Sequence, residues 1–293
     1  MADLLVTAIL RGGIYALMAL GLSLVFGVMN IANFAHGEFY MLGAYFSYFA
    51  LMVFGWNPIV SILFATVAAF VVGAILEKLL FYPLRLRNKS NWLMNTFLLT
   101  LGMSLILQNG AKLLWGSTYR GITSYFGGAT NLGTMAVSND RIFGFFVAVL
   151  AIAVFVLFLN KTKQGRAIRA VSMDETGASL CGVKLKTVFT LTFALSCAMG
   201  ALAGACLLSI SPAFPTIGTS PLMKSWFVLI LVGMGNLGAS IVGGLIVGVL
   251  ETASFAWLGS GWQDVFSLVI IIIILLIKPN GIFGKKGVKS AAE

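Results

Sequence analysis

The sequence predicts an all-α, polytopic membrane protein with about eight or nine transmembrane helices. Of its 293 residues, 59% are hydrophobic and only 10% are charged, and the mean hydropathy is +1.00. A soluble domain carries about 25% charged residues. The apolar runs are continuous rather than alternating, which is typical of spanning helices and argues against an outer-membrane barrel. We therefore take residues 1–293 as a single transmembrane domain.

The basic residues indicate on which side of the membrane each loop lies. Most of the 19 Lys and Arg residues fall in three clusters: Lys78, Arg85, Arg87 and Lys89; Lys161, Lys163, Arg166, Arg169, Lys184 and Lys186; Lys278, Lys285, Lys286 and Lys289. Short loops rich in Lys and Arg stay in the cytoplasm. The pattern predicts a cytoplasmic loop at 161–187, a cytoplasmic C-terminus and a periplasmic loop at 116–140. It also explains the net charge of +10 without a nucleic-acid partner.

The reactive side chains indicate neither an enzyme nor a metalloprotein. Cys197 and Cys206 fall in a predicted span and Cys181 in a predicted cytoplasmic loop, so a disulfide framework is not expected. The single histidine, His36, cannot form a histidine cluster, and there is no cysteine-rich motif. We expect no metal site and no catalytic residue in this chain.

The first apolar segment, 4–26, is interrupted by Arg11, Gly12 and Gly13. The uninterrupted part, 14–26, would rise only about 20 Å, whereas the hydrocarbon core is roughly 30 Å thick. Either the helix begins before Arg11, or it stops within the membrane and the chain continues at depth. The side on which the N-terminus lies depends on this choice.

The stretch 30–38 is polar and lies between two uncharged apolar runs, 14–26 and 39–54. It contains two amides, an imidazole and a carboxylate: Asn30, Asn33, His36 and Glu38. A helix break permitted by Gly27 and Gly37 would direct the amides and the imidazole toward the bundle interior, because lipid offers polar groups no partner. Glu38 would then lie at a helix N-terminus, where the dipole favours its charge. The alternative is a polar turn at the membrane surface.

At depth, these polar side chains have two alternative roles. They line the translocation path, or they satisfy freed backbone groups and hold the break in shape. For Asn30 and Asn33 the structural role is the preferred interpretation.

Two further spans carry polar residues. The span 59–81 ends with Glu77 and Lys78, which we interpret as a snorkelling pair at the cytoplasmic interface. In the span 92–115, Thr100, Ser104 and Gln108 recur every four residues and share one helical face. Such a stripe is expected to bond to neighbouring helices; a substrate path is the alternative.

The second half of the chain predicts a second broken segment. Spans are expected at 143–159, 188–208, 239–257 and 262–277, with an external proline-containing loop at 211–221. The short apolar run 222–234 meets a break rich in Gly around Asn236, much as the first run meets the stretch 30–38. The two breaks suggest an internal repeat of the kind found in transporters. Because glycine is common in membrane helices, chance similarity is the alternative. Glycine pairs at 200/204 and 244/248 predict close helix packing.

The loop 161–187 is longer than the roughly 2–8 residues usual between bundled helices. Its alanines favour helix, and Arg166, Arg169 and Asp174 supply charges of both signs. Composition leaves two interpretations: a short helix pair with a small-residue docking face, or a solvated loop.

This loop resembles the cytoplasmic coupling loop of the branched-chain amino-acid ABC transporter permease family. The matching positions are Gly165-Arg166-Ala167, Arg169-Ala170, Asp174, Ala178 and Gly182-Val183. Other motifs of the family match along the chain: Tyr15-Ala16-Leu17, Gly102-Met103-Ser104, Leu107-Gln108-Asn109, Val232-Gly233-Met234-Gly235 and Lys278-Pro279-Asn280-Gly281-Ile282. The stretch 33–38, Asn-Phe-Ala-His-Gly-Glu, is more similar to the LivH-type subunit than to its LivM-type partner.

The resemblance implies an importer permease for leucine, isoleucine and valine in the bacterial inner membrane. It implies four kinds of partner subunit or surface: a second, LivM-like permease, two ATPase subunits, a periplasmic binding protein and the lipid bilayer. ATP and Mg would bind to the ATPases, and this chain would hold no cofactor; it lacks the Gly-rich Lys-Ser/Thr phosphate loop. The implied coupling residues are Gly165, Arg166, Arg169, Asp174, Ala178 and Gly182. Asn30, Asn33, His36, Glu38 and Asn236 are the candidates for the translocation path or the helix breaks.

Other functions stay open at this point. Related systems carry urea or small organic acids. A free-standing channel or ion-coupled carrier is a different class of protein, and it is weakened because only Glu38 and Glu251 are acids within predicted spans. Sequence alone does not decide whether the permease core is homodimeric or heterodimeric.

Overall fold

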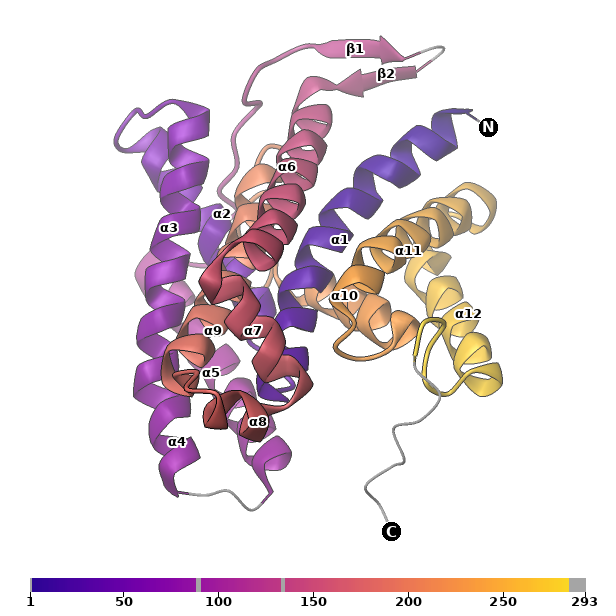
Figure 1. Cartoon of the computed structure of the whole chain (residues 1–293). Helices are drawn as coiled ribbons and strands as arrows, with labels where there is room; N and C mark the ends of the chain where they lie inside the picture. Colours follow the sequence, from indigo (N-terminus) through magenta and orange to yellow (C-terminus); the bar gives the residue numbers. More distant parts are fainter. Residues whose placement is uncertain (1, 88–90, 133–134, 285–293) are drawn as a thin grey trace.

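The computed structural model describes residues 2–87, 91–132 and 135–284, and these residues are predominantly helical (Figure 1). The elements are α1 (Ala2–Met29), α2 (His36–Met52), α3 (Pro58–Leu76), the π-helix η1 (Glu77–Phe81), α4 (Tyr82–Arg87), α5 (Trp92–Trp115), β1 (Ala129–Leu132), β2 (Met135–Ser138), α6 (Asn139–Lys161), α7 (Lys163–Met173), α8 (Glu175–Leu180), α9 (Leu185–Cys206), α10 (Thr219–Val232), α11 (Leu237–Leu258), the 3-10 helix η2 (Ser260–Trp262) and α12 (Gln263–Ile277). Lys89, Lys285, Lys286 and Lys289 of the basic clusters lie outside the described residues.

Six described helical segments are long and apolar enough to cross a membrane. They are α1, α3 continued through α4, α5, α6, α9 and α11. Two shorter apolar helices, Thr219–Val232 and Leu268–Ile277, accompany them. The predicted class, a polytopic all-α membrane protein, is confirmed.

α1 is one unbroken helix of 28 residues, so it begins before Arg11. Gly12 and Gly13 lie inside it and permit close packing. A Cβ added to Gly12 would lie 2.9 Å from the Cα atom of Leu245 in α11, and one added to Gly13 would lie 2.6 Å from the Phe145 ring of α6. The glycines that interrupt the apolar run are therefore packing residues, and α1 has the full length of a span.

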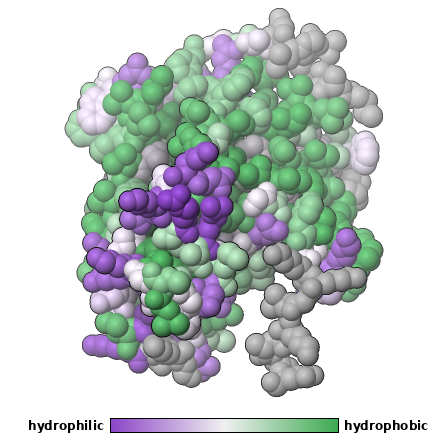
Figure 2. Space-filling model, viewed as in Figure 1, coloured by the Kyte–Doolittle hydropathy of each residue, from purple (hydrophilic) through white to green (hydrophobic). Residues whose placement is uncertain are grey.

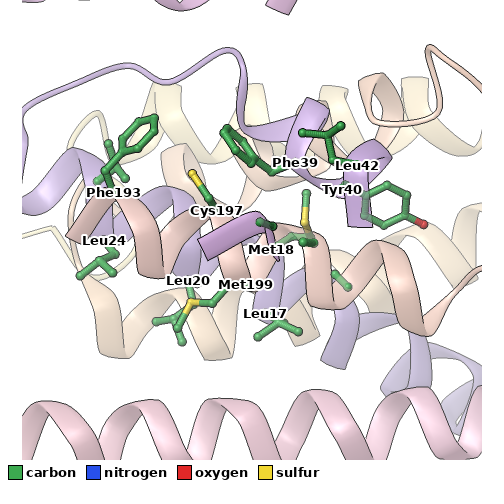
Figure 3. Packing of buried hydrophobic residues seen from close by; sticks show 14 of the residues in the cluster. Leu17, Met18, Leu20, Leu24, Phe39, Tyr40, Leu42, Phe193, Cys197 and Met199 are labelled. Atoms are coloured by element: carbon green, nitrogen blue, oxygen red, sulfur yellow. The ribbon is translucent and has the colours of Figure 1, made fainter. Parts of the chain in front are cut away.

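The core lies where α1, α2 and α9 meet. Figure 3 shows Leu17 and Met18 of α1, Phe39 and Tyr40 of α2, and Cys197 of α9 within one cluster. In the most apolar 18-residue stretch of α1, 83% is buried inside the structure, whereas the corresponding share in α5 is 17%. α1 is therefore central in the bundle and α5 is peripheral.

The predicted glycine pairs pack as expected. Gly204 of α9 packs directly on the backbone of Tyr40 in α2, and Gly248 of α11 packs on Gly12 of α1. Close approach of this kind maximises van der Waals contact between helices, which drives association where no hydrophobic effect operates.

The loop 116–140 contains a hairpin that sequence patterns did not indicate. β1 and β2 pair antiparallel, with Ala129 opposite Ser138. The loop is fixed to the bundle by Tyr125, whose hydroxyl donates to the carbonyl oxygen of Ala205 at 2.5 Å, and burial raises the pKa of this hydroxyl. The hairpin lies at the opposite end of the bundle from α4 and α8 (Figure 1).

The prediction of a snorkelling Glu77–Lys78 pair is wrong for Glu77. This carboxylate is fully buried. It accepts a hydrogen bond from the Thr190 hydroxyl at 2.6 Å and pairs with the Arg85 guanidinium at 3.5 Å. Glu77 lies one turn after Gly73, which packs on Cys197 of α9, so the register of α3 directs it toward α9 instead of toward the interface.

Candidate translocation and coupling sites

The stretch 30–38 contains a real interruption between two helices. α1 ends at Met29 and α2 begins at His36. The residue that makes the turn is Asn30, whose φ of 51° lies in the left-handed region that asparagine tolerates. The prediction that Gly27 and Gly37 permit the break is wrong: both lie in helices. They allow backbones to meet, Gly27 on Gly235 and Gly37 on Gly218.

Hydrogen bonds to α5 place this break at depth. The Phe34 N–H donates to the Thr100 hydroxyl at 3.2 Å, and that hydroxyl lies 3.1 Å from the carbonyl oxygen of Ala32 as a donor. Ser104, one turn further along, lies near the middle of the 24-residue α5, about 18 Å from either end. The polar stripe of α5 thus bonds across helices as predicted. The turn at Asn30 lies near the start of α5, where the Trp92 indole N–H donates to Met29, and residues 34–38 lead from it toward the middle of the bundle.

Asn33 and His36 are buried; Asn33 bonds to the backbone of the break, and His36 joins the start of α2 to α1 and α9. The Asn33 Oδ1 accepts the Ala35 N–H at 3.1 Å. His36 Nε2 lies 3.0 Å from the carbonyl oxygen of Met18, and its Nδ1 lies 3.3 Å from the Ser196 hydroxyl. The inward orientation expected for these two side chains is confirmed.

Asn30 differs from this expectation, because it is exposed. Its backbone makes the turn, and a residue at the outside of a turn has no reason to direct its amide into the bundle.

Glu38 is the buried charge at the break. It is 1% exposed and lies in the first turn of α2, as predicted. One carboxylate oxygen, Oε1, accepts from the Ser104 hydroxyl at 2.8 Å and from the Gln108 amide at 2.7 Å. The other, Oε2, has no hydrogen-bond partner among the described residues. Two neutral donors hold the carboxylate in place, and the buried Oε2 is left without a donor among the described residues.

A second helix starts beside α2. Gly218 packs on Gly37, so α10 begins at the level where α2 begins. α10 has 14 residues and rises about 21 Å, less than a full span. The expected external loop 211–221 therefore runs inward: Ala213 pairs with Arg120 of the hairpin loop, and Gly218 reaches the middle of the bundle. Two discontinuous helices meet at their N-termini, an arrangement typical of transporter binding sites.

The predicted break around Asn236 is present between α10 and α11. Gly233 and Gly235 adopt positive φ angles of 99° and 81°. Asn236 is exposed and caps α11, because its Oδ1 accepts the Ala239 N–H at 3.2 Å. Asn236 thus belongs to the break. The second break touches the last turn of α1 where Gly235 meets Gly27, and the internal repeat itself stays a prediction.

A cluster of charges that sequence reasoning missed joins α1, α10 and α11. The Lys224 ammonium contacts the Glu251 carboxylate and donates to the Tyr15 hydroxyl at 3.2 Å. Arg11 lies 3.9 Å from the same carboxylate. The signal was a Lys and a Glu within apolar runs, since such residues pair with each other inside a membrane. The cluster fixes the half-length helix α10 to its neighbours.

The coupling loop forms a helix pair, α7 and α8, which decides between its two interpretations. Four of the predicted residues build this pair. Gly165 packs on α6, and Ala178 is buried. Asp174 caps α8 by accepting the Thr176 N–H at 3.0 Å, and Gly182 ends the pair with a φ of 82°.

The remaining predicted coupling residues are on the surface. Arg166 and Arg169 are exposed, and Arg169 donates to the Asn160 amide oxygen at 2.9 Å. Two apolar residues that sequence reasoning missed are also exposed: Met173 at 88% and Leu180 at 84%. Figure 2 shows a hydrophilic patch over the region of α7, surrounded by hydrophobic surface. The loop therefore presents cations beside protruding apolar side chains.

Within the described residues there is no group of three or more His, Cys, Asp or Glu side chains able to hold a metal ion. The three cysteines are free, with Cys197 and Cys206 buried and Cys181 exposed.

Comparison with known proteins identifies the family. Residues 4–275 match the family model described as branched-chain amino acid transport system / permease component. The chain is 33% identical to the high-affinity branched-chain amino acid transport system permease protein LivH of Salmonella typhimurium and to that of Escherichia coli, over 95% of this chain and 94% of each relative. It is 29% identical to BraD of Pseudomonas aeruginosa, over 97% of this chain and 96% of that protein. No solved structure matches the chain. The chain belongs to the family of permease components of branched-chain amino acid transport systems.

Proposed function

We propose that this chain is the non-catalytic permease subunit of an ATP-binding-cassette importer that carries branched-chain or related amino acids. Family membership and the names of the relatives support the substrate class. One structural observation carries the assignment to transport: a buried carboxylate, Glu38, lies where two discontinuous helices meet near the middle of the bundle. An ionisable group at that depth is expected to serve a substrate path.

Glu38 is the proposed contact for the α-ammonium group of the substrate. Its Oε1 is held by Ser104 and Gln108, and its Oε2 is directed at no donor among the described residues. An ammonium donates hydrogen bonds and cannot accept them, so a fixed carboxylate oxygen complements it. A single such contact binds weakly, and an importer needs weak contacts so that the substrate leaves the path.

The roles of the other predicted site residues follow from their contacts. Asn33 holds the backbone of the first break, Asn30 makes its turn, and His36 fixes the start of α2 to α1 and α9. Asn236 caps the helix after the second break. Their proposed role is to keep α2 and α10 in the geometry that positions Glu38.

The proposed docking surface for an ATPase is the α7–α8 pair. Arg166, Arg169, Met173 and Leu180 are exposed on it. Cations with adjacent apolar anchors fit an acidic rim around an apolar pocket. Gly165, Asp174, Ala178 and Gly182 shape the pair.

The assembled importer has four other parts in this proposal: a second, LivM-like permease, two ATPase subunits that bind ATP and Mg, and a periplasmic binding protein. Closure of the ATPases moves α7 and α8, and the bundle alternates about the path. The chain lies in the bacterial inner membrane with its C-terminus and α7–α8 in the cytoplasm and loop 116–140 in the periplasm.

Co-purification tests this assignment. The chain is expressed with its cognate ATPases, second permease and binding protein, and ATP hydrolysis is measured with leucine, urea and a small organic acid as ligands. We expect one complex whose hydrolysis is stimulated only by the ligand that also protects the binding protein against thermal unfolding. Protection by urea or an organic acid reassigns the substrate. A chain that purifies without an ATPase, yet transports after ATP depletion, is a channel or ion-coupled carrier.

Glu38 is tested separately within that complex. Glu38→Gln keeps both hydrogen bonds to Oε1 and removes the charge, so assembly and stimulated hydrolysis are expected to persist while uptake falls. Asn109→Ala is the matched control, because this exposed amide bonds only to Leu105 of its own helix. Wild-type uptake by the Glu38 variant excludes Glu38 from the path.

A further inference from the structure

The cytoplasmic end of α3 is the one place where a described helix adopts π geometry. The π-helix η1 runs from Glu77 to Phe81 and leads into α4, which carries Arg85. Short π turns occur frequently at functional sites, because they redirect a side chain that a regular α-helix would point elsewhere. The turn lies between Glu77, which the register of α3 already directs toward α9, and Arg85, so Arg85 is the residue whose direction it sets.

Arg85 joins three elements at this point. Its guanidinium lies 3.5 Å from the Glu77 carboxylate and 3.8 Å above the ring of Phe189 in α9. It also lies 5.4 Å from the ring centre of Trp92, the first residue of α5. Glu77 is tied in turn to α9 by the Thr190 hydroxyl. The guanidinium is 20% exposed, so ion pairing and ring stacking fix its position.

The two ends of this contact series are the coupling helices and the first break. On one side, α8 ends at Leu180 and α9 begins at Leu185, so the α9 residues that hold Arg85 and Glu77, Phe189 and Thr190, follow closely after the coupling helices. On the other side, the Trp92 indole N–H donates to the carbonyl oxygen of Met29 at 3.0 Å. Met29 is the last residue of α1 and precedes Asn30, which makes the turn of the break.

We propose that Arg85 is a positioning residue that transmits movement of α8 to the break at 30–35. The proposal rests on the proposed function, in which α7 and α8 dock on an ATPase. When α8 shifts, it moves the start of α9; Phe189 and Thr190 then displace Arg85 and Glu77, and the guanidinium carries Trp92 with it. The Trp92 hydrogen bond then pulls on the end of α1 and changes the turn that holds Phe34 and the start of α2. Coupling between distant sites is carried by contiguous contacts of this kind.

The test is the number of substrate molecules transported per ATP hydrolysed, measured with the full complex in proteoliposomes. Arg85→Gln is expected to assemble and hydrolyse ATP while this ratio falls, roughly 2- to 30-fold for a residue on a coupling network. Arg87→Gln, on the same helix and exposed, is the matched control and should keep the wild-type ratio. A purely structural role lowers assembly, hydrolysis and uptake together and leaves the ratio unchanged.

Arg85→Gln leaves the buried Glu77 carboxylate without its cation, so this variant could fail to fold. Two further variants test the proposal independently of that outcome. Glu77→Gln/Arg85→Gln removes both charges, and Trp92→Phe removes only the N–H that bonds Met29. Both should lower the ratio, Trp92→Phe less than the double variant. A wild-type ratio in both overturns the proposal. If instead the wild-type complex itself shows no ATP-dependent uptake, the proposed function fails. If the wild-type complex couples ATP hydrolysis to uptake and Arg85→Gln couples them equally well, only the role of Arg85 fails.

Discussion

Thr100→Val tests whether α5 holds the break in shape. The Thr100 hydroxyl accepts the Phe34 N–H at 3.2 Å and donates toward the carbonyl oxygens of Ala32 and Phe97. Valine has nearly the same shape and cannot accept a hydrogen bond, so the Phe34 N–H loses its partner. The bond to Phe97 lies within α5, and any helical threonine that bonds in this way would lose it too.

The magnitude follows from one orphaned N–H. Leaving a buried donor unsatisfied costs about 1–3 kcal/mol, whereas cross-helix hydrogen bonds in membranes average about 0.6 and reach about 1.7 kcal/mol. The two ranges overlap at about 1–2 kcal/mol, which corresponds to roughly a 5- to 30-fold change in an equilibrium constant. We expect the free energy of unfolding to fall by that amount and uptake to fall with it.

Thr96→Val is the matched control for this prediction. Thr96 lies one turn earlier on α5, is equally buried, and bonds only to Trp92 and Leu93 of its own helix. Unfolding in mixed detergent gives the stability of both variants, and proteoliposome assays give their uptake. Equal stability and uptake in the two variants would refute the argument that the Thr100 hydroxyl holds the break.

Three other predictions concern packing, topology and coupling. Gly204→Ala should destabilise the bundle by about 1–3 kcal/mol, because the new methyl group meets the Tyr40 backbone; Gly102→Ala, which meets open space, should be neutral or stabilising in the same unfolding assay. In a cysteine-free background, Thr130→Cys should react with an impermeant thiol reagent in intact cells; labelling only after lysis would invert the topology. Arg169→Glu should leave the complex assembled while ATP hydrolysis proceeds without uptake, and full uptake would count against the docking role of α7.

Structural features that follow from the absence of water in the membrane were predicted correctly from sequence patterns. Thr100, Ser104 and Gln108 share one face of α5, and lipid offers polar side chains no hydrogen-bond partner. Their periodicity therefore indicated hydrogen bonds to other helices, which the structure contains. The short apolar run 222–234 likewise corresponds to a short helix, since the 14 residues of α10 are too few for a span, whereas the sequence left the extent of the first run open. The first run proved longer, because Gly12 and Gly13 continue the helix.

Glycine explains most of what sequence reasoning missed. A glycine can end a helix or let two helices touch, and composition does not distinguish these uses. Gly27 and Gly37 were expected to break the helix and instead pack on Gly235 and Gly218, which lie far away in the chain. The turn is made by Asn30, a residue whose polar side chain suggested a buried role.

The wrong interpretation of Glu77 has a similar origin. Its proximity to Lys78 suggested an interface pair, while its partners are Arg85 of α4, beyond the π turn, and Thr190 of α9. Two cations, Lys78 and Arg85, lie near Glu77 in the sequence. Local helix geometry decides which of them pairs with the carboxylate, and this geometry cannot be predicted from the order of the residues.

The central claim is that this chain transports amino acids only as part of an ATP-driven complex. Its most direct test is the uptake of radiolabelled leucine into proteoliposomes that contain the complete complex, with and without ATP and with and without the binding protein. We predict uptake that requires both ATP and the binding protein, and that is lost in Glu38→Gln while ATP hydrolysis continues. Leucine uptake by this chain alone, without ATP, would contradict the claim.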